Sequence, residues 1–204
     1  MKITQIEELT RARSRVYLDE EFAFVLYKGE LRSFHVREGE EMDQESLETI
    51  LTKVLPKRAK LRAMNLLKSR DYTRKQLYDK LREGGYPEQV IQEALDYMES
   101  FRYLDDLRYA VNFICSYSNA RSRRRIEQDL TGKGIDRATL EKAWMEWEEQ
   151  GGRQDEGAMI SALLEKKHFD PARADQKEKA RIYGFLTRKG FSGEEVRRAI
   201  FLPI

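Results

Sequence analysis

The fold is decided by the segment Leu77-Tyr-Asp-Lys-Leu81-Arg-Glu-Gly-Gly85-Tyr86, because its pattern recurs twice farther along the chain. It returns as Ile126-Glu-Gln-Asp-Leu130-Thr-Gly-Lys-Gly134-Ile135 and as Ile182-Tyr-Gly-Phe-Leu186-Thr-Arg-Lys-Gly190-Phe191. A spacing of 49 residues separates Gly85 from Gly134, and 56 residues separate Gly134 from Gly190. Self-similarity at such a period is typical of tandem structural repeats.

Each repeat predicts three helices. The two apolar residues of the motif stand four apart on one helix face, the glycine ends that helix in a left-handed conformation, and a second helix follows. A preceding helix completes each unit, over about 57–68, 106–117 and 156–167. Helix starts are indicated by the capping boxes Thr73-x-x-Gln76 and Ser192-x-x-Glu195 and by the N-cap residues Ser122 and Asp136. Two helices joined by a tight glycine turn and backed by a third resemble helix-turn-helix units.

The first segment differs from the rest of the chain. Residues 15–18, 22–27 and 31–36 are rich in β-branched and aromatic side chains and predict three short strands of a meander. An amphipathic helix that covers one face of this sheet is expected from Asp43 onward, and we expect Pro56 to end it.

The predicted fold is therefore mainly α: three tandem three-helix repeats preceded by a small N-terminal β-meander and helix. The predicted domains are 1–55 for the meander and its covering helix, then 57–104, 105–152 and 153–204 for the repeats. Charged residues make up 36% of the chain and its mean hydropathy is −0.74, which suits slender modules better than one large core.

Composition also bears on location and partners. No run of about 18 apolar residues and no secretory leader is visible, so we expect a cytoplasmic protein with no membrane contact. Residues 1–55 carry 8 Lys/Arg and 12 Asp/Glu, a net charge of −4, whereas residues 56–204 carry 30 and 24, a net charge of +6. This asymmetry indicates either a body that faces a polyanion or ordinary solvated surface.

Side chains for catalysis or metal binding are scarce. The chain has one cysteine, Cys115, expected as a small buried hydrophobe, and two histidines, His35 and His168, expected at the surface. No Cys/His spacing typical of a metal site is present, and no GK[ST] follows Gly84-Gly85 or Gly151-Gly152. We therefore predict no catalytic residue, no metal and no cofactor; the protein acts by binding.

The strongest candidate for binding is Arg121-Ser122-Arg123-Arg124-Arg125, which places four guanidinium groups at a helix start. Guanidinium groups suit phosphate or carboxylate, and positive charge at a helix start opposes the helix dipole. The alternative is that Glu127 and Asp129 neutralise the cluster locally. Other cations fall near the same point of each repeat and predict a basic stripe, unless they only solubilise the chain: Arg74, Lys75, Lys133, Arg188, Lys189, Arg197 and Arg198.

Several aromatic residues lie among these cations. Tyr86, Tyr97, Phe101, Tyr103 and Tyr109 suggest base stacking, but their helical spacing favours packing of the first repeat against the second. Trp144 and Trp147 are likewise expected in the core.

These motifs resemble those of the RecX family, the bacterial modulators of the RecA recombinase. The resemblance rests on Tyr103-Leu-Asp-Asp106 followed by Arg108-Tyr-Ala110, on Arg125-Ile-x-x-Asp129-Leu-x-x-Lys-Gly-Ile135, and on Arg188-Lys-Gly-Phe191. The stretch Val16-Tyr-Leu-Asp-x-x-Phe-Ala-Phe24 looks like the strand-bearing arm of many members. The chain departs from the pattern at Ser122-Arg123, where a Gly-containing pair is expected, and at Asp129, where Glu is more usual.

The resemblance implies a regulator that binds the RecA–DNA filament and lowers its ATP hydrolysis, strand exchange and coprotease activity, in DNA repair, homologous recombination and the SOS response. Its expected partners are the RecA filament and, weakly and without sequence preference, single- and double-stranded DNA, and we expect a monomer. The alternatives are a stand-alone DNA-binding protein with helix-turn-helix-like units, an adaptor for another protein, and an enzyme such as a nuclease.

Overall fold

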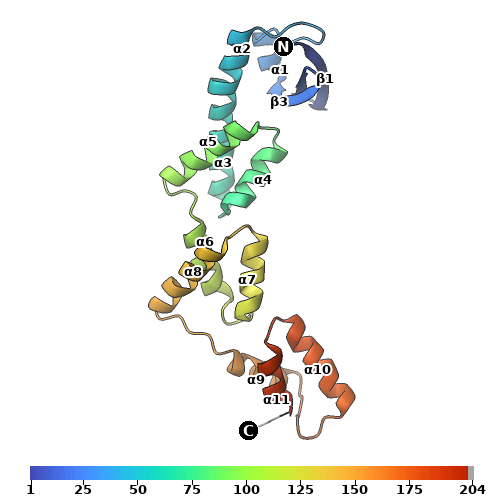
Figure 1. Cartoon of the computed structure of the whole chain (residues 1–204), viewed down its shortest axis with the longest axis vertical. Coiled ribbons are helices and arrows are strands. Elements are labelled where there is room, and N and C mark those ends of the chain that lie inside the picture. Colours follow the sequence, from blue (N-terminus) through green and yellow to red (C-terminus); the bar gives the residue numbers. More distant parts are fainter. Residues whose placement is uncertain (202–204) are drawn as a thin grey trace. The chain divides into compact units, whose positions relative to one another are not determined.

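The computed structural model describes residues 1–201, which form a small sheet followed by helices (Figure 1). This part of the chain divides into two compact units, with the division between Asp105 and Asp106.

The first unit opens with an antiparallel meander of β1 (Ile3–Thr10), β2 (Arg13–Leu18) and β3 (Glu21–Tyr27). In the central strand Val16 pairs with Ile6 on one side and with Phe24 on the other. The strands predicted at 15–18 and 22–27 are confirmed.

The third predicted strand, at 31–36, is wrong. Those residues belong to the short helix α1 (Lys28–Ser33) and to the turn after it. The helix start is stabilised locally, because the Glu30 carboxylate accepts a hydrogen bond from the backbone N–H of Tyr27 at 2.7 Å. The strand that the sequence did not predict is β1, in which Ile3 alone is fully buried, so the strand lacks a clear apolar alternation.

The helix expected to stop at Pro56 instead continues through it. Helix α2 (Gln44–Thr49) leads into the π-turn η1 (Ile50–Val54) and then into α3 (Leu55–Ser69). In the wide turn the N–H of Leu55 bonds to the carbonyl of Ile50, and Pro56 follows in the first turn of α3, where a missing N–H is tolerated. The helix start expected at Asp43 is confirmed, because Asp43 is the N-cap of α2 and its carboxylate accepts a hydrogen bond from the N–H of Ser46 at 2.8 Å.

The meander and the first repeat share one hydrophobic core, to which α3, α4 (Arg74–Glu83) and α5 (Glu88–Ser100) contribute with the sheet. An ion pair of 2.6 Å joins Arg58 of α3 to Glu30 of α1, and Arg58 also donates to the carbonyl of Val25. This side chain therefore links the strand-bearing segment to the repeat. The separation of 1–55 from 57–104 as domains stays a prediction.

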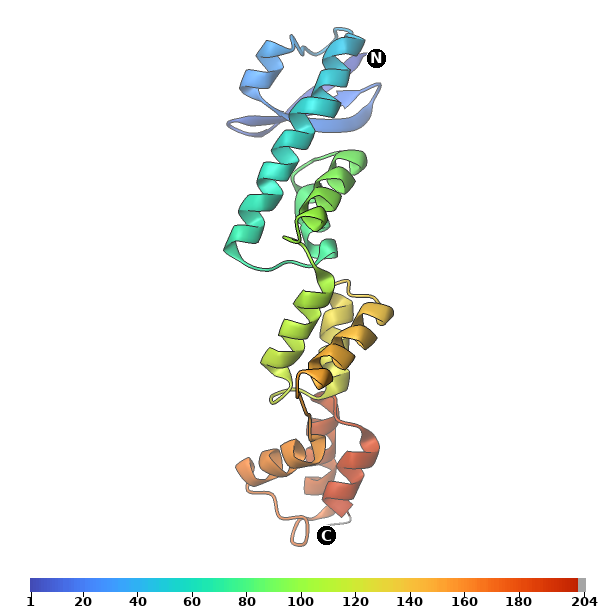
Figure 2. The same ribbon diagram turned by 90° about the vertical axis from the view of Figure 1, so that its left-hand side faces the viewer.

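The second unit holds two more three-helix repeats (Figure 2). Repeat 2 consists of α6 (Asp106–Tyr117), α7 (Arg123–Gly132) and α8 (Arg137–Glu149), and repeat 3 consists of α9 (Glu156–Lys166), α10 (Gln176–Arg188) and α11 (Gly193–Phe201). Each repeat has its own core, around Trp144 in repeat 2 and around Leu186 in repeat 3. The mainly α fold with three tandem three-helix repeats is confirmed; residues 202–204 of the predicted last domain lie outside the described residues.

The motif that predicted the repeats has the conformation expected of it. Gly85, Gly134 and Gly190 have φ values of +78°, +93° and +94°, in the region that favours glycine. The predicted N-caps are confirmed, since Thr73 accepts from the N–H of Gln76 and Asp136 from the N–H of Thr139. Ser192 likewise accepts from the N–H of Glu195 at 3.1 Å.

Two predictions about burial are wrong. Tyr97, Phe101 and Tyr103 are not core residues, because 39%, 56% and 55% of their surfaces are exposed around the end of α5. Cys115 is exposed, since its neighbour Ile114 faces the core and the next residue of a helix lies about 100° away. Tyr86 and Tyr109 pack against the cores of their units, and Trp144 and Trp147 are buried as expected.

Candidate functional site

The arginine cluster lies at the start of α7 in repeat 2. Ser122 is fully buried, and its hydroxyl accepts a hydrogen bond from the backbone N–H of Arg125 at 3.2 Å. The N-cap therefore sets the direction of the helix, and Arg123, Arg124 and Arg125 form its first turn with exposed side chains.

Two arginines of the cluster converge on one carboxylate. Arg121 pairs with Asp129 at 2.7 Å and Arg125 pairs with the other oxygen of Asp129 at 3.1 Å. The Asp129 side chain is only 18% exposed, and the guanidinium of Arg121 also stacks 3.9 Å from the ring centre of Tyr117. This aspartate thus neutralises part of the cluster.

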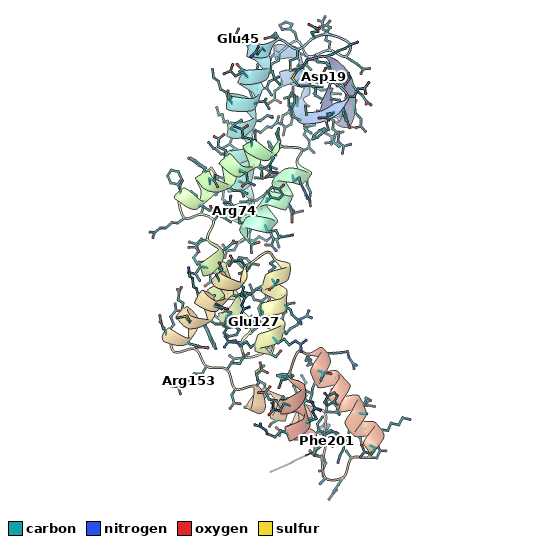
Figure 3. The ribbon with its side chains drawn as sticks, viewed as in Figure 1. Asp19, Glu45, Arg74, Glu127, Arg153 and Phe201 are labelled. Atoms are coloured by element: carbon teal, nitrogen blue, oxygen red, sulfur yellow. The ribbon has the colours of Figure 1, made fainter. Side chains whose placement is uncertain are left out.

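Arg123 is also engaged. Its guanidinium pairs with Glu127 at 3.0 Å and with Glu148 of α8 at 3.3 Å, and it lies 4.4 Å from the ring centre of Trp144. Figure 3 labels Glu127 on α7. Within the described residues, Arg124 is the arginine of the cluster that takes part in no ion pair.

The same helix start forms the contact between repeats 2 and 3. The Glu156 carboxylate, at the start of α9, accepts the backbone N–H of Arg123 at 2.6 Å. The Ser122 hydroxyl donates to the carbonyl of Lys189 at 3.2 Å, and the side-chain amide of Gln154 donates to the carbonyls of Ser118 and Arg121, both at 2.7 Å. A carboxylate at this position satisfies a free N–H and offsets the helix dipole. The positive charge at the start of α7 is therefore offset within the fold by the Glu156 carboxylate of repeat 3.

Glu156 is electrostatically unusual. Burial raises the pKa of its carboxyl group, and the neighbouring carboxylate of Glu195 raises it further, although the hydrogen bond from Arg123 acts in the opposite direction. A groove of about 570 Å³ adjoins this contact, and Arg124 and Arg198 line it together with Glu194 and Glu195. Groups of both signs thus line the groove.

The predicted cations of the first repeat are bound to carboxylates. Arg74, labelled on α4 in Figure 3, pairs with Asp96 at 2.9 Å and with Glu99 at 2.6 Å. Burial of Arg74 opposes its charge, but the hydrogen bonds to Glu99 and Asp96 outweigh it and raise the pKa of the guanidinium. Lys75 pairs with Asp79 one turn along the helix at 3.2 Å.

The remaining candidates lie in the second unit and differ in their contacts. The ammonium groups of Lys133 and Lys189 lie 5.6 Å and 5.3 Å from the ring centres of Phe113 and Phe185. Arg198 pairs with Glu194 at 3.4 Å, and Arg197 donates to the carbonyl of Gly193. The basic stripe through all three repeats stays a prediction.

Sequence reasoning missed two exposed cations of α10, Lys177 and Arg181, which share a helix face with Arg188. Lys177 and Arg181 are four residues apart, and Arg181 and Arg188 are seven apart. This spacing along one helix face was the signal that could have identified them.

Among residues 1–201 no group of three or more His, Cys, Asp or Glu side chains could hold a metal ion. No helix in the same range is both long and apolar enough to cross a membrane. His35 and His168 are exposed turn residues with φ of +50° and +53°.

Comparison with known proteins identifies the repeats. Residues 59–98, 105–143 and 154–200 match the models of the first, second and third three-helix domains of RecX. A relative from Clostridioides difficile (strain 630) named "Regulatory protein RecX" is 29% identical, over 97% of this chain and 93% of its own length. One of the same name from Vibrio vulnificus is 34% identical, over 68% of this chain and 88% of the relative.

Solved structures agree on the fold. A crystal structure of regulatory protein RecX has a TM-score of 0.62 and 24% identity, over 98% of both chains. A crystal structure of RecX from Lactobacillus salivarius has a TM-score of 0.56 and 23% identity, over 72% of this chain and 95% of that one.

Proposed function

The chain belongs to the RecX family of regulatory proteins, and we propose that it binds the RecA–DNA filament and lowers its ATP hydrolysis, strand exchange and coprotease activity. The proposal rests on one observation above all: three RecX domains follow one another in the order in which the family models number them. The relatives of similar length carry the name of a regulatory protein.

The arrangement of the cores supports action through surfaces. Repeats 2 and 3 each enclose a small core of their own, and exposed candidate cations lie at the start of α7 and at the end of α10: Arg123, Arg124, Arg125, Arg188 and Lys189. We propose that the basic faces of these repeats contact the DNA or acidic protein surfaces of the filament. The mixed-charge groove beside Arg124 suits a protein surface with groups of both signs.

The proposal extends to partners and location. We propose that the chain is a cytoplasmic monomer that binds single- and double-stranded DNA weakly and without base preference. Binding of this kind depends on phosphate contacts and weakens steeply as salt rises.

The test is RecA-catalysed, single-strand-dependent ATP hydrolysis with increasing amounts of the chain, measured beside its binding to the same DNA alone. We expect inhibition at concentrations well below those needed to bind bare DNA. Unchanged hydrolysis together with tight, base-selective binding to duplex would overturn the proposal in favour of a stand-alone DNA-binding protein.

The part played by the arginine cluster is tested separately, at Arg124. Arg124→Gln removes an exposed guanidinium that holds no ion pair within the described residues, so folding should be unaffected. If Arg124 contacts a phosphate of single-stranded DNA, the slope of log K against log salt should fall by about 0.7. The matched control is Arg137→Gln on α8, whose guanidinium pairs with Glu141. Equal slopes in both variants would remove Arg124 from the interface.

A further inference from the structure

We infer that the solvent face of α10 in repeat 3 is a nucleic-acid contact, with Lys177, Arg181 and Arg188 binding successive phosphates of one strand. This inference rests on the proposed function, because it names the surface through which the chain would hold the DNA of the filament. Neither Lys177 nor Arg181 was predicted as a binding residue from the sequence.

The first observation is the alignment of the three cations. With 3.6 residues per turn, positions 177, 181, 184 and 188 fall within a sector of about 60° around the helix axis. All three cations are exposed, whereas Ile182 and Leu186 on the opposite side are buried in the core of the repeat. The row runs along about 16 Å of helix.

The second observation is the absence of neutralising carboxylates. Within the described residues, Lys177, Arg181 and Arg188 take part in no ion pair, and the ion pairs of repeat 3 join Arg173 to Asp170 and Arg198 to Glu194. Three aligned like charges repel one another along a helix face. Their arrangement is unfavourable in the free protein and becomes favourable when anions lie against it.

The third observation comes from the internal repeat. Arg125 of repeat 2 stands where Arg181 stands in repeat 3, and Asp129 stands where Phe185 does. Asp129 binds Arg125 and Arg121, whereas Phe185 lies between the ammonium groups of Lys167 and Lys189, at 4.5 Å and 5.3 Å. The exchange of a carboxylate for a phenyl ring leaves the cations of α10 available, whereas Arg121 and Arg125 of repeat 2 are held by Asp129.

The surface chemistry favours nucleic acid over an acidic peptide. Protein interfaces depend on buried apolar or aromatic anchors, and the sector of α10 that carries the cations has none. Gly184 lies between them with the guanidinium of Arg188 over it, at 3.2 Å from where a Cβ would be. A row of like charges without apolar anchors fits a row of phosphates, and it lacks groups that would recognise individual bases.

The experiment compares Arg181→Gln/Arg188→Gln with the control Arg137→Gln/Arg173→Gln in the full chain. Both pairs lower the net charge from +2 to 0 by the same chemical change, and the control arginines are 92% and 90% exposed. Gln is nearly as good a helix former as Arg, so both variants should fold. Fluorescence anisotropy with a labelled single strand of mixed sequence, and with its duplex, gives affinities between about 50 and 200 mM salt.

Loss of two phosphate contacts should lower the slope of log K against log salt by about 1.4 for the single strand and about 1.8 for duplex. The same relation makes binding to the single strand about 10- to 30-fold weaker near 0.1 M salt. The control should keep the slope of the unmodified chain. Equal slopes in the two variants would overturn the α10 contact. If the α10 variant instead lost binding to polyglutamate and not to nucleic acid, the contact would also be overturned, because that result would indicate an acidic protein partner.

RecA-dependent ATP hydrolysis in the same samples separates this inference from the proposed function. Inhibition by the unmodified chain with equal salt slopes in both variants overturns the α10 contact alone. No inhibition by the unmodified chain, with a reduced slope only in the α10 variant, overturns the proposed function and leaves the contact standing.

Discussion

Gly190→Ala should destabilise repeat 2 although Gly190 belongs to repeat 3. An alanine Cβ at this position would lie 2.4 Å from the Ser122 hydroxyl and 2.9 Å from Cβ of Arg125. Both distances are shorter than the contacts that Cβ atoms make in proteins, so Ser122 must move. Ser122 caps α7 and also donates to the carbonyl of Lys189, and both hydrogen bonds would then be lost.

The magnitude follows from three contributions. A left-handed alanine costs about 1–2 kcal/mol, loss of the Ser122 cap about 1 kcal/mol, and loss of the Ser122–Lys189 hydrogen bond about 1 kcal/mol. Gly190→Ala should therefore cost about 3–4 kcal/mol. Gly151→Ala is the matched control, because Gly151 has φ of +88° and its Cβ would meet no atom within 4 Å. It should cost only the backbone contribution, about 1–2 kcal/mol.

The assay is urea-induced unfolding followed by tryptophan fluorescence, since both tryptophans of the chain, Trp144 and Trp147, lie in the core of repeat 2. Amide hydrogen exchange adds a local measurement, and the N–H of Arg125 should exchange faster in Gly190→Ala. Equal losses of stability in the two variants, or unchanged exchange at Arg125, would refute the contact between the repeats as its cause.

Three further predictions concern single charges. Because the pKa of Glu156 is raised in the folded state, its contribution to stability is present below the ordinary value of 4.5 and is lost as pH rises through the folded pKa. Glu156→Gln should thus gain stability relative to the unmodified chain between pH 4 and 7 in urea titrations, and a constant difference would contradict this. Asp129→Asn releases Arg121 and Arg125, so it should lower stability by about 1 kcal/mol yet tighten single-strand binding in anisotropy, and weaker binding would count against release. Arg58→Ala leaves the half-buried carboxylate of Glu30 without its ion-pair partner and should cost about 3 kcal/mol in thermal unfolding. A loss below about 1 kcal/mol would show that water replaces the guanidinium group.

The three repeats could be predicted from the amino-acid sequence because their signals are local. A left-handed glycine after a helix, a hydroxyl or carboxylate three residues before a free N–H, and apolar residues four apart each act within one or two turns. Gly134, Asp136 and Leu130 therefore have the conformation, the cap and the burial that were predicted. The local signal of Pro56 gave a wrong helix end, because the π-turn before it accommodates the proline in the first turn of α3.

Which cations lack a carboxylate partner could not be predicted from the sequence, because it depends on how the helices pack. Glu148 reaches Arg123 across 25 residues, and Glu156 reaches the N–H of the same residue across 33. Neither contact has a signature in the sequence around the arginine cluster, because each depends on how helices of different elements pack. The same physics leaves the cations of α10 without carboxylates, since ion pairing requires a partner within about 4 Å in space and not along the chain.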